Sequence, residues 1–386
     1  MNQVNPEAPP KRPVQGLQVY RTYCPDPRGG LQEAIRQICL ATQAHGISHR
    51  VFTLSPHPSP RIVHRPEADV YRAQQHFEIA SSGFSLSALP LFGRLCRWAD
   101  IVHYHFPWPF ADVLQLLANP STPTIITYHS DIVRQRALSL LYQPLMKRFF
   151  ARTDCLVATS PAYAESSPVL RRYRARLAMI PLGLDQASYA APTQSALRVA
   201  EQSYGRDFFL FVGVLRYYKG LPTLLEAVRY TDMPVVIAGT GPEEPFLRAM
   251  AHASSLDNVR FAGFVSEEMK AALFRLCRAV VFPSNARSEA FGITLLEGAM
   301  WGRPLLCTEL KTGTTFINRH RETGLVVPPG DPAALRDAMH TLHRNPDLAQ
   351  TLGRGARRRF EEAFTSQAMG AAYSILYRSI RSGRRT

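Results

Sequence analysis

Long apolar runs are missing from this sequence of 386 residues. No stretch approaches the roughly 20 consecutive apolar residues that a membrane-spanning helix needs. Residues 1–16 also lack an apolar core of the length that signal peptides carry. We therefore expect a chain without a membrane span, whose contact with any membrane is peripheral.

Paired cysteines and metal-ligand motifs are missing as well. The cysteines lie far apart and form no Cys-x-x-Cys pair; they are Cys24, Cys39, Cys96, Cys155, Cys277 and Cys307. This spacing argues against a disulfide framework and a zinc site, and it favours a reduced, cytoplasmic compartment. Neither an Asp-x-Asp motif nor a His/Cys cluster with metal-ligand spacing occurs, so we expect no metal and no cofactor.

Several catalytic signatures are also absent. The sequence contains no Gly-x-Ser-x-Gly elbow and no Walker A motif, which weakens the case for hydrolases and P-loop NTPases. A Gly239-Thr240-Gly241 turn follows an apolar run, but Glu244 occupies the position of the third glycine in a dinucleotide fingerprint. The turn is therefore weak evidence for a dehydrogenase.

Basic residues are in excess, with 45 Lys and Arg against 30 Asp and Glu and a formal net charge of +15. This excess indicates an anionic partner, whether nucleic acid, an acidic membrane surface or a phosphorylated substrate. Residues 134–176 concentrate nine basic side chains against two acidic ones. The segment is either a solvated face or a surface that docks on anionic lipids of the inner membrane. Because no nucleic-acid-binding motif accompanies the charge, we expect no nucleic-acid partner.

The length exceeds what one hydrophobic core usually supports, which predicts two domains. Short runs of β-branched and aromatic residues alternate with amphipathic stretches, as is typical of a mainly parallel sheet. The runs are residues 17–20, 50–54, 101–104, 124–128, 155–159 and 177–180, then 208–215, 234–238, 258–261, 279–282 and 304–307. We expect a flexible N-terminus at 1–15, domains at 16–187 and 207–365, a linker at 188–206, and a final helix with a basic tail at 366–386.

Two carboxylates accompany a predicted helix start in the C-terminal half. The run 279–282 opens into a loop that contains Glu289, and a helix with Glu297 follows. Backbone N–H groups from Phe291 onward are free at such a start and attract an anionic or hydroxyl-rich ligand. Each carboxylate accepts hydrogen bonds from sugar hydroxyls. The alternative is ordinary helix capping, which places Glu at the same positions.

Cations and glycines follow two other predicted strands. Gly213, Arg216 and Lys219 come after the run 208–215, and together they resemble a clamp that neutralises a diphosphate without a metal. An ordinary basic loop is the alternative. Gly29 and Gly30 precede a predicted helix, where they permit close approach of a ligand to its N-terminus.

Histidines follow two strands of the N-terminal half. His129 ends one strand, and His103 with His105 ends another. Such histidines can polarise a leaving phosphate or hold an acceptor hydroxyl, although a single histidine is more often structural. Of the three, His129 is the stronger candidate for a site residue.

Together the Gly-Gly loop, the Gly-x2-Arg-x2-Lys-Gly clamp, the Ser-Glu-x-Phe-Gly-x4-Glu stretch and the segment 324–332 resemble retaining glycosyltransferase family four. The resemblance begins at about residue 16 and implies an α/β fold of the GT-B type. That fold has two facing Rossmann-like domains with parallel sheets, and its C-terminal helix crosses back to the N-domain. By the same resemblance, 16–187 would bind the acceptor and 207–365 the nucleotide sugar.

The resemblance also implies roles by position. Glu289 would contact the donor hexose, Glu297 the ribose, and Arg216 with Lys219 the diphosphate. His129 would lie near the reacting centre. The remaining nucleotide-sugar contacts would come mainly from backbone groups and loop residues, namely Gly29, Gly30, Gly213, Phe264, Val265, Phe291, Gly292 and Ile293. Ala290 departs from the family, where glycine is common, and this change should matter little if only the neighbouring backbone is used.

More narrowly, the segments 105–110, 128–132 and 214–220 resemble bacterial O-antigen and A-band mannosyl- and rhamnosyltransferases. This resemblance implies GDP-mannose or GDP-rhamnose as donor and a lipid-linked saccharide as acceptor in lipopolysaccharide biosynthesis. In the family, retention is commonly described as front-face substitution, in which a donor phosphate oxygen takes the acceptor proton, so no protein nucleophile is expected. Two alternatives stay open: a nucleotide-sugar epimerase of the same fold, and a non-catalytic carbohydrate-assembly protein.

Overall fold

The computed structural model describes residues 12–26, 29–79, 82–132 and 136–383, without the side chains of 136–141. Most of the expected flexible N-terminus, the end of the basic tail, and Arg134 of the basic segment therefore lie outside the described residues. In the described part, no helix is both long enough and apolar enough to cross a membrane.

The N-terminal domain is built on an eight-stranded sheet with the order β10-β9-β8-β7-β1-β2-β4-β3. All neighbouring pairs are parallel except β3 with β4, and β7 is buried at every position, as strands covered on both faces are. The strands are β1 (Val14–Val19), β2 (Ile47–Ser55), β3 (Ile62–His64), β4 (Asp69–Gln74), β7 (Ile101–Phe106), β8 (Thr124–Tyr128), β9 (Cys155–Ala158) and β10 (Leu177–Met179). The accompanying helices and hairpin are α1 (Gly30–Gln43), α2 (Ala88–Trp98), α3 (Pro109–Ala118), α4 (Arg136–Ala151), α5 (Pro161–Ser166), α6 (Pro168–Arg172), β5 (Phe77–Ile79) and β6 (Ser82–Phe84).

The C-terminal domain repeats the plan with a six-stranded parallel sheet in the order β13-β12-β11-β14-β15-β16. Its strands are β11 (Phe209–Val212), β12 (Val235–Ala238), β13 (Val259–Gly263), β14 (Ala279–Phe282), β15 (Leu305–Thr308) and β16 (Gly324–Val327). Its helices are α7 (Gln194–Tyr204), α8 (Leu221–Ala227), α9 (Glu244–Ala253), α10 (Glu267–Leu276), α11 (Ile293–Met300), α12 (Thr314–Ile317), α13 (Pro332–Arg344) and α14 (Pro346–Ala363). Every apolar run singled out in the sequence falls on a strand, and the expected two-domain α/β architecture is confirmed.

The expected linker at 188–206 contains helix α7, which begins after Thr193 and packs against α10 of the C-terminal domain. Thr193 caps this helix by accepting a hydrogen bond from the N–H of Ala196. The helix buries only Ala200, which explains why its polar sequence looks like a connecting segment.

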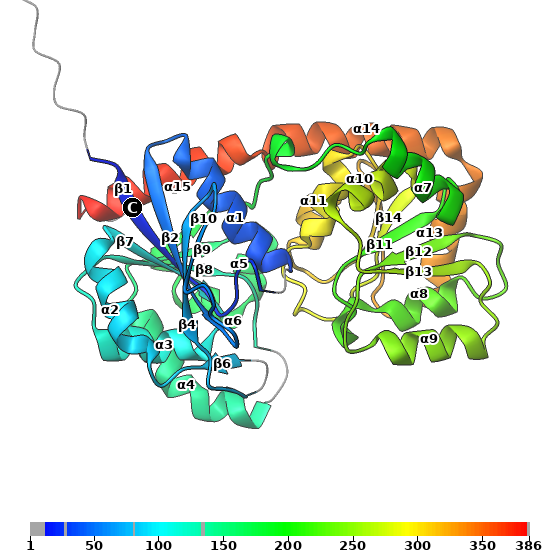
Figure 1. Ribbon diagram of the computed structural model, residues 1–386. Helices are drawn as coiled ribbons and strands as arrows, with labels where there is room; N and C mark the ends of the chain where they lie inside the picture. The colour runs from blue at the N-terminus through cyan, green and yellow to red at the C-terminus, as the bar shows by residue number, and fades with distance from the viewer. Residues whose placement is uncertain (1–11, 27–28, 80–81, 133–135, 384–386) are drawn as a thin grey trace, which may run out of the picture.

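The last helix, α15 (Ser366–Arg381), returns to the N-terminal domain and packs along α1 (Figure 1). The chain crosses between the domains twice at one place, where Leu184 N–H donates to Phe364 O and Ser366 N–H donates to Leu184 O. Gly370 permits the close packing, because a Cβ there would lie 2.3 Å from the carbonyl oxygen of Ala41. The crossing helix predicted from the sequence is confirmed.

Candidate functional site

The loop after β11 is pressed against the loop after β14. Gly220 has a φ of +67°, and a Cβ there would lie 1.9 Å from the carbonyl oxygen of Pro283. The N–H of Asn285 also donates to the carbonyl oxygen of Tyr218 at 2.9 Å. Only glycine suits both the conformation and the contact. This approach joins two segments that were singled out separately in the sequence.

Lys219 and Glu289 meet across these loops. Lys219 Nζ donates to Glu289 Oε2 at 2.5 Å, and each side chain is only 11% exposed. Ser284 Oγ donates to the same oxygen at 3.3 Å, and the ammonium lies 4.7 Å from the centre of the Phe282 ring. Two of the predicted site residues therefore form a nearly buried ion pair directly beyond the carboxyl ends of β11 and β14.

Arg216 begins the turn that carries Lys219. Its carbonyl oxygen accepts the Lys219 N–H at 3.0 Å, and its side chain is half-buried. Within the described part of the chain, the guanidinium has no hydrogen-bond or ion-pair partner. Arg216 therefore keeps all its donors for a ligand beside the Lys219–Glu289 pair. Gly213 lies behind the lysine stem, with its ideal Cβ position 3.8 Å from Lys219 Cε.

Glu297 is buried on α11 and is already paired. Lys270 Nζ of α10 donates to Glu297 Oε1 at 2.8 Å and also lies 2.8 Å from Glu267. Burial raises the pKa of Glu297, although Lys270 opposes this shift. Burial alone would lower the pKa of Lys270, but the two carboxylates outweigh it and raise that pKa. The lysine was not foreseen, because its position in the sequence gives no sign of its contact with Glu297.

The start of α11 presents backbone donors. Gly292, with a φ of +94°, caps the helix without a side-chain bond, and its carbonyl oxygen accepts from the N–H of Leu295. Among the described residues, the N–H groups of Phe291, Gly292 and Ile293 have no recorded acceptor. The Phe291 side chain is buried and packs edge-on against Phe364, so only its backbone is available.

The start of α1 lies beside the start of α11. A Cβ on Gly30 would be 3.8 Å from Ile293 Cδ1, which places the Gly29–Gly30 segment of one domain against the donors of the other. Both helix N-termini carry a partial positive charge, so together they attract an anion. Pro27 and Arg28, which precede the glycines, lie outside the described residues.

His129 follows β8 at the edge of the N-terminal domain that faces the other domain. Its Nε2 is 2.9 Å from His105 Nδ1, and its side chain is half-buried. Burial lowers the pKa of His129 to about 3, so the ring is neutral at physiological pH. By contrast, His103 and His105 of β7 are 0% and 1% exposed. Their side chains are buried against the sheet, where a ligand does not reach them.

An interdomain bridge lies next to these residues and was not foreseen. Arg287 Nη2 lies 3.4 Å from Asp131 Oδ2 and donates to Ser166 Oγ at 2.9 Å. Its Nη1 donates to the carbonyl oxygen of Lys311 at 3.2 Å, which also accepts from Ser166 Oγ. The bridge connects the loop of His129 with the loop of Glu289.

Phe264 and Val265 lie after β13, apart from the ion pair, and no contact between them and Lys219 or Glu289 is recorded in the described chain. Phe264 is 84% exposed, whereas Val265 is half-buried and packs on the core. The exposed phenyl ring of Phe264 leaves a flat apolar face open to a ligand.

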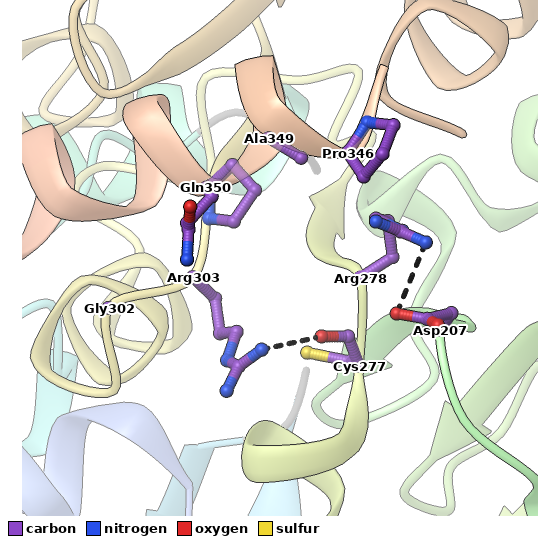
Figure 2. Close-up of a pocket in the computed structure, with 9 residues that line it drawn as sticks. Asp207, Cys277, Arg278, Gly302, Arg303, Pro346, Ala349 and Gln350 are labelled. Atoms are coloured by element: carbon purple, nitrogen blue, oxygen red, sulfur yellow. Dashed lines mark hydrogen bonds and ion pairs between the residues drawn. The ribbon is translucent and has the colours of Figure 1, made fainter. Parts of the chain in front are cut away.

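A cavity of about 230 Å³ lies at the opposite end of the C-terminal sheet (Figure 2). Its residues Asp207, Arg278 and Pro304 precede β11, β14 and β15, whereas the candidate residues follow these strands. Figure 2 shows Arg278 turned to Asp207, at 3.3 Å, and Arg303 donating to the carbonyl oxygen of Cys277 at 3.1 Å. This cavity is not part of the candidate site. Among the described residues, no group of three or more His, Cys, Asp or Glu side chains could hold a metal ion.

The two halves of the chain match two family models. Residues 28–188 match the model described as Glycosyltransferase Family 4, and residues 194–359 match Glycosyl transferases group 1. Curated relatives match nearly the whole chain. The chain is 49% identical over 350 residues to D-rhamnosyltransferase WbpZ from Pseudomonas aeruginosa, covering 91% of this chain and 92% of that protein. It is 48% identical over 366 residues to O-antigen chain mannosyltransferase C from Escherichia coli, covering 94% of this chain and 98% of that protein.

Solved structures show the same fold at low identity. Sucrose-phosphate synthase from Thermosynechococcus elongatus superposes with a TM-score of 0.81 at 22% identity, covering 96% of this chain and 100% of that chain. HepE from Anabaena, in complex with UDP and glucose, superposes with a TM-score of 0.76 at 16% identity, covering 95% of this chain and 100% of that chain. These likenesses bear on the fold alone.

Proposed function

The chain belongs to glycosyltransferase family 4, with a C-terminal half of the glycosyl transferases group 1 type, and we propose that it transfers mannose or rhamnose from a GDP-sugar to a lipid-linked saccharide in O-antigen biosynthesis. The two relatives that it resembles over nearly their whole length are named as a rhamnosyltransferase and a mannosyltransferase, which supports these sugars. Residues 207–365 would hold the donor and residues 16–187 the acceptor.

The observation that carries the proposal is the Lys219–Glu289 pair, 2.5 Å apart, beside an Arg216 guanidinium that has no hydrogen-bond or ion-pair partner among the described residues. Arg216 and Lys219 stabilise the charge that develops on the departing diphosphate, and the N–H groups at the start of α11 add to this effect. Cations and N–H groups already in place do this work without a metal ion. Glu289 accepts hydroxyl hydrogen bonds from the transferred hexose.

The nucleoside part of the donor extends along the C-terminal domain. Glu297 accepts hydrogen bonds from the ribose hydroxyls, while Lys270, 2.8 Å away, holds its carboxylate in place. The base lies against Phe264 and Val265, where the 84% exposed phenyl ring supports stacking. Gly29 and Gly30 approach the phosphates from the N-terminal domain. Transfer proceeds with retention, by front-face substitution without a protein nucleophile.

Because the acceptor is linked to a lipid, the basic segment of residues 134–176 would dock on anionic lipids at the inner face of the cytoplasmic membrane. Of the basic side chains of residues 134–176 that the structure describes, six are exposed: Lys147, Arg148, Arg152, Arg171, Arg172 and Arg174. The end of α4 is next to the turn after α6, because Phe150 stacks on Tyr173 with ring centroids 5.4 Å apart. Each such cation contributes about 1 kcal/mol near an anionic leaflet.

A donor screen tests the proposal. The protein is incubated with GDP- and UDP-sugars in the presence of a chelator, with and without lipid-extracted glycan acceptors, and melting temperature and transfer are measured. Stabilisation by GDP together with acceptor-dependent transfer from GDP-mannose or GDP-rhamnose is the expected result. Sugar release without acceptor dependence would point to the epimerase alternative, and no nucleotide effect at all would point to a non-catalytic protein.

A further inference from the structure

A continuous chain of hydrogen bonds runs from α1 to His129 through the interior of the N-terminal domain. Thr42 Oγ1 is 2.7 Å from His49 Nε2, and His49 Nδ1 is 3.2 Å from Gln18 Nε2. Gln18 Oε1 is 2.7 Å from His105 Nε2, and His105 Nδ1 is 2.9 Å from His129 Nε2. The first four members are at most 5% exposed, so water does not compete for these bonds.

The direction of the chain is set at Thr42. A hydroxyl group has one hydrogen, and Thr42 donates its hydrogen to the carbonyl oxygen of Ile38 at 2.7 Å. Its oxygen therefore accepts from His49 Nε2–H. Burial lowers the pKa of His49 to about 4, outweighing the opposite effect of the nearby Gly16 backbone, so the ring is neutral. Because its hydrogen is on Nε2, its Nδ1 carries a lone pair. The amide nitrogen of Gln18 must then donate to that Nδ1.

The orientation of Gln18 passes the direction on to His129. With its nitrogen toward His49, the amide presents its oxygen to His105, which donates from Nε2–H. Neutral His105 is then an acceptor at Nδ1, and His129 Nε2–H donates to it. The lone pair of His129 is consequently on Nδ1, which has no recorded partner in the described chain.

A second branch engages the other hydrogen of the Gln18 amide. The other amide hydrogen is donated to Tyr377 Oη at 3.1 Å, and this hydroxyl lies 2.7 Å from His103 Nδ1. His103 Nε2 is 2.7 Å from Thr127 Oγ1. Both hydrogens and the oxygen of the amide are thus engaged, and rotation by half a turn would keep these bonds only if His49, His105 and the Tyr377 hydroxyl all exchanged their donor and acceptor roles.

We propose that Thr42, His49, Gln18 and His105 are positioning residues that hold His129 in the Nε2–H tautomer, so that Nδ1 accepts a hydrogen bond from a hydroxyl group of the bound sugar substrate. The substrate class rests on the proposed function; the tautomer does not. In this state His129 cannot donate to a phosphate oxygen through Nδ1. The sequence left two roles open for His129, namely to polarise a leaving phosphate or to hold a hydroxyl group. The hydrogen-bond network favours contact with a hydroxyl group.

Ring-nitrogen chemical shifts test the tautomer directly. Long-range proton–nitrogen spectra of the full chain labelled with 15N-histidine distinguish a protonated from an unprotonated ring nitrogen, and His129→Asn identifies the resonances of His129. We expect His129 Nδ1 to be unprotonated. Thr42→Val removes the acceptor of His49 and should populate the Nδ1–H tautomer of His129, whereas Thr42→Ser keeps the hydroxyl and should preserve the wild-type pattern.

Kinetics with the same variants test the role. We expect Thr42→Val to lower kcat/KM about three- to tenfold, as loss of one neutral hydrogen bond does, and Thr42→Ser to restore it. A protonated Nδ1 in the wild type overturns the proposal, as does an unchanged His129 pattern or unchanged kcat/KM in Thr42→Val. If the wild type transfers no sugar but its His129 Nδ1 is unprotonated, the proposed function fails while the positioning of the ring stands.

Discussion

Arg287 Nη2 lies 3.4 Å from Asp131 Oδ2, and this ion pair joins the two domains beside the candidate site. Asp131 is held in place by Tyr128 Oη, which donates to it at 2.9 Å, and by Ser167 Oγ at 2.7 Å. Asp131 follows His129 by two positions and Arg287 precedes Glu289 by two. The pair therefore fixes the spacing between the histidine of one domain and the carboxylate of the other.

Removal of the bridge should loosen that spacing. Because Arg287 is partly exposed, with a side chain 32% accessible, we expect Arg287→Ala to change the free energy of unfolding by less than about 1 kcal/mol. We expect kcat/KM to fall about tenfold, since donor and acceptor are then less well oriented. Arg319→Ala, which breaks an exposed pair with Glu322 elsewhere, should leave kcat/KM unchanged. Wild-type kinetics in Arg287→Ala would contradict a role for the bridge.

Substitutions in the Lys219–Glu289 pair distinguish its contribution to stability from its contribution to catalysis. Lys219→Met leaves a carboxylate that is 11% exposed without its cation, and we expect a loss of about 2 to 4 kcal/mol in the free energy of unfolding. Lys219→Met combined with Glu289→Gln removes both charges and should regain most of this loss. Both variants should lose at least about 100-fold in kcat/KM. A folded double variant with near-wild-type turnover would show that the pair is only structural.

Buried histidines predict how stability depends on pH. Burial lowers the pKa of His49 to about 4 and the pKa values of His103 and His105 well below the ordinary value of 6.5. The unfolded chain binds protons near pH 6.5 while the folded chain does not, so the free energy of unfolding decreases as the pH falls from about 6.5 towards 4. Each histidine contributes a slope of up to about 1.4 kcal/mol per pH unit.

Denaturant titrations measure how the free energy of unfolding changes with pH. They are carried out at about pH 7.5, 6.5 and 5.5, which span the range in which the histidines of the unfolded chain begin to bind protons. We expect little change between the first two values and a clear loss at the third. Constant stability across the series would mean that these rings bind protons over the same pH range in the folded and the unfolded chain, which would contradict the lowered pKa values.

The packing of α15 on α1 depends on Gly370. A Cβ there would approach the carbonyl oxygen of Ala41 to 2.3 Å, so Gly370→Ala must displace one helix. We expect a loss of about 1 to 3 kcal/mol. Gly93 of α2 is a matched control, because the nearest recorded atom to its ideal Cβ position is the flexible Arg97 Nη1 at 3.8 Å. Gly93→Ala should be neutral or stabilising. Equal effects of the two substitutions on chemical denaturation would contradict the close approach.

The sequence predicts the parts of this molecule that depend on local pattern. Strands buried on both faces, such as β7 and β11, stand out as apolar runs, and the glycine and cation spacing after β11 is enough to single out Lys219. Glu289 is equally visible, because it follows a strand and precedes a helix start. Their contact is the product of folding, since 70 positions separate them.

What the sequence could not predict are pairings that depend on tertiary geometry. Lys270 reaches Glu297 from another helix, and Arg287 reaches Asp131 from the other domain, 156 positions away. The orientation of His129 depends on a hydroxyl group of α1 through three intervening side chains. Such partners have no shared periodicity or spacing in the sequence, so they can be identified only from the three-dimensional structure. The helix within 188–206 was missed for a related reason, since it buries little apolar surface.

The central claim is that this protein transfers a sugar and that Arg216 stabilises the departing diphosphate. The most direct test compares acceptor-dependent transfer from GDP-mannose or GDP-rhamnose by the wild type and by Arg216→Ala, in the presence of a chelator. Since no partner of the Arg216 side chain is recorded in the described chain, the variant should melt at the wild-type temperature. We predict transfer by the wild type and a rate at least about 100-fold lower in Arg216→Ala. Equal rates in the two proteins, or no transfer by the wild type from any nucleotide sugar, would contradict the account.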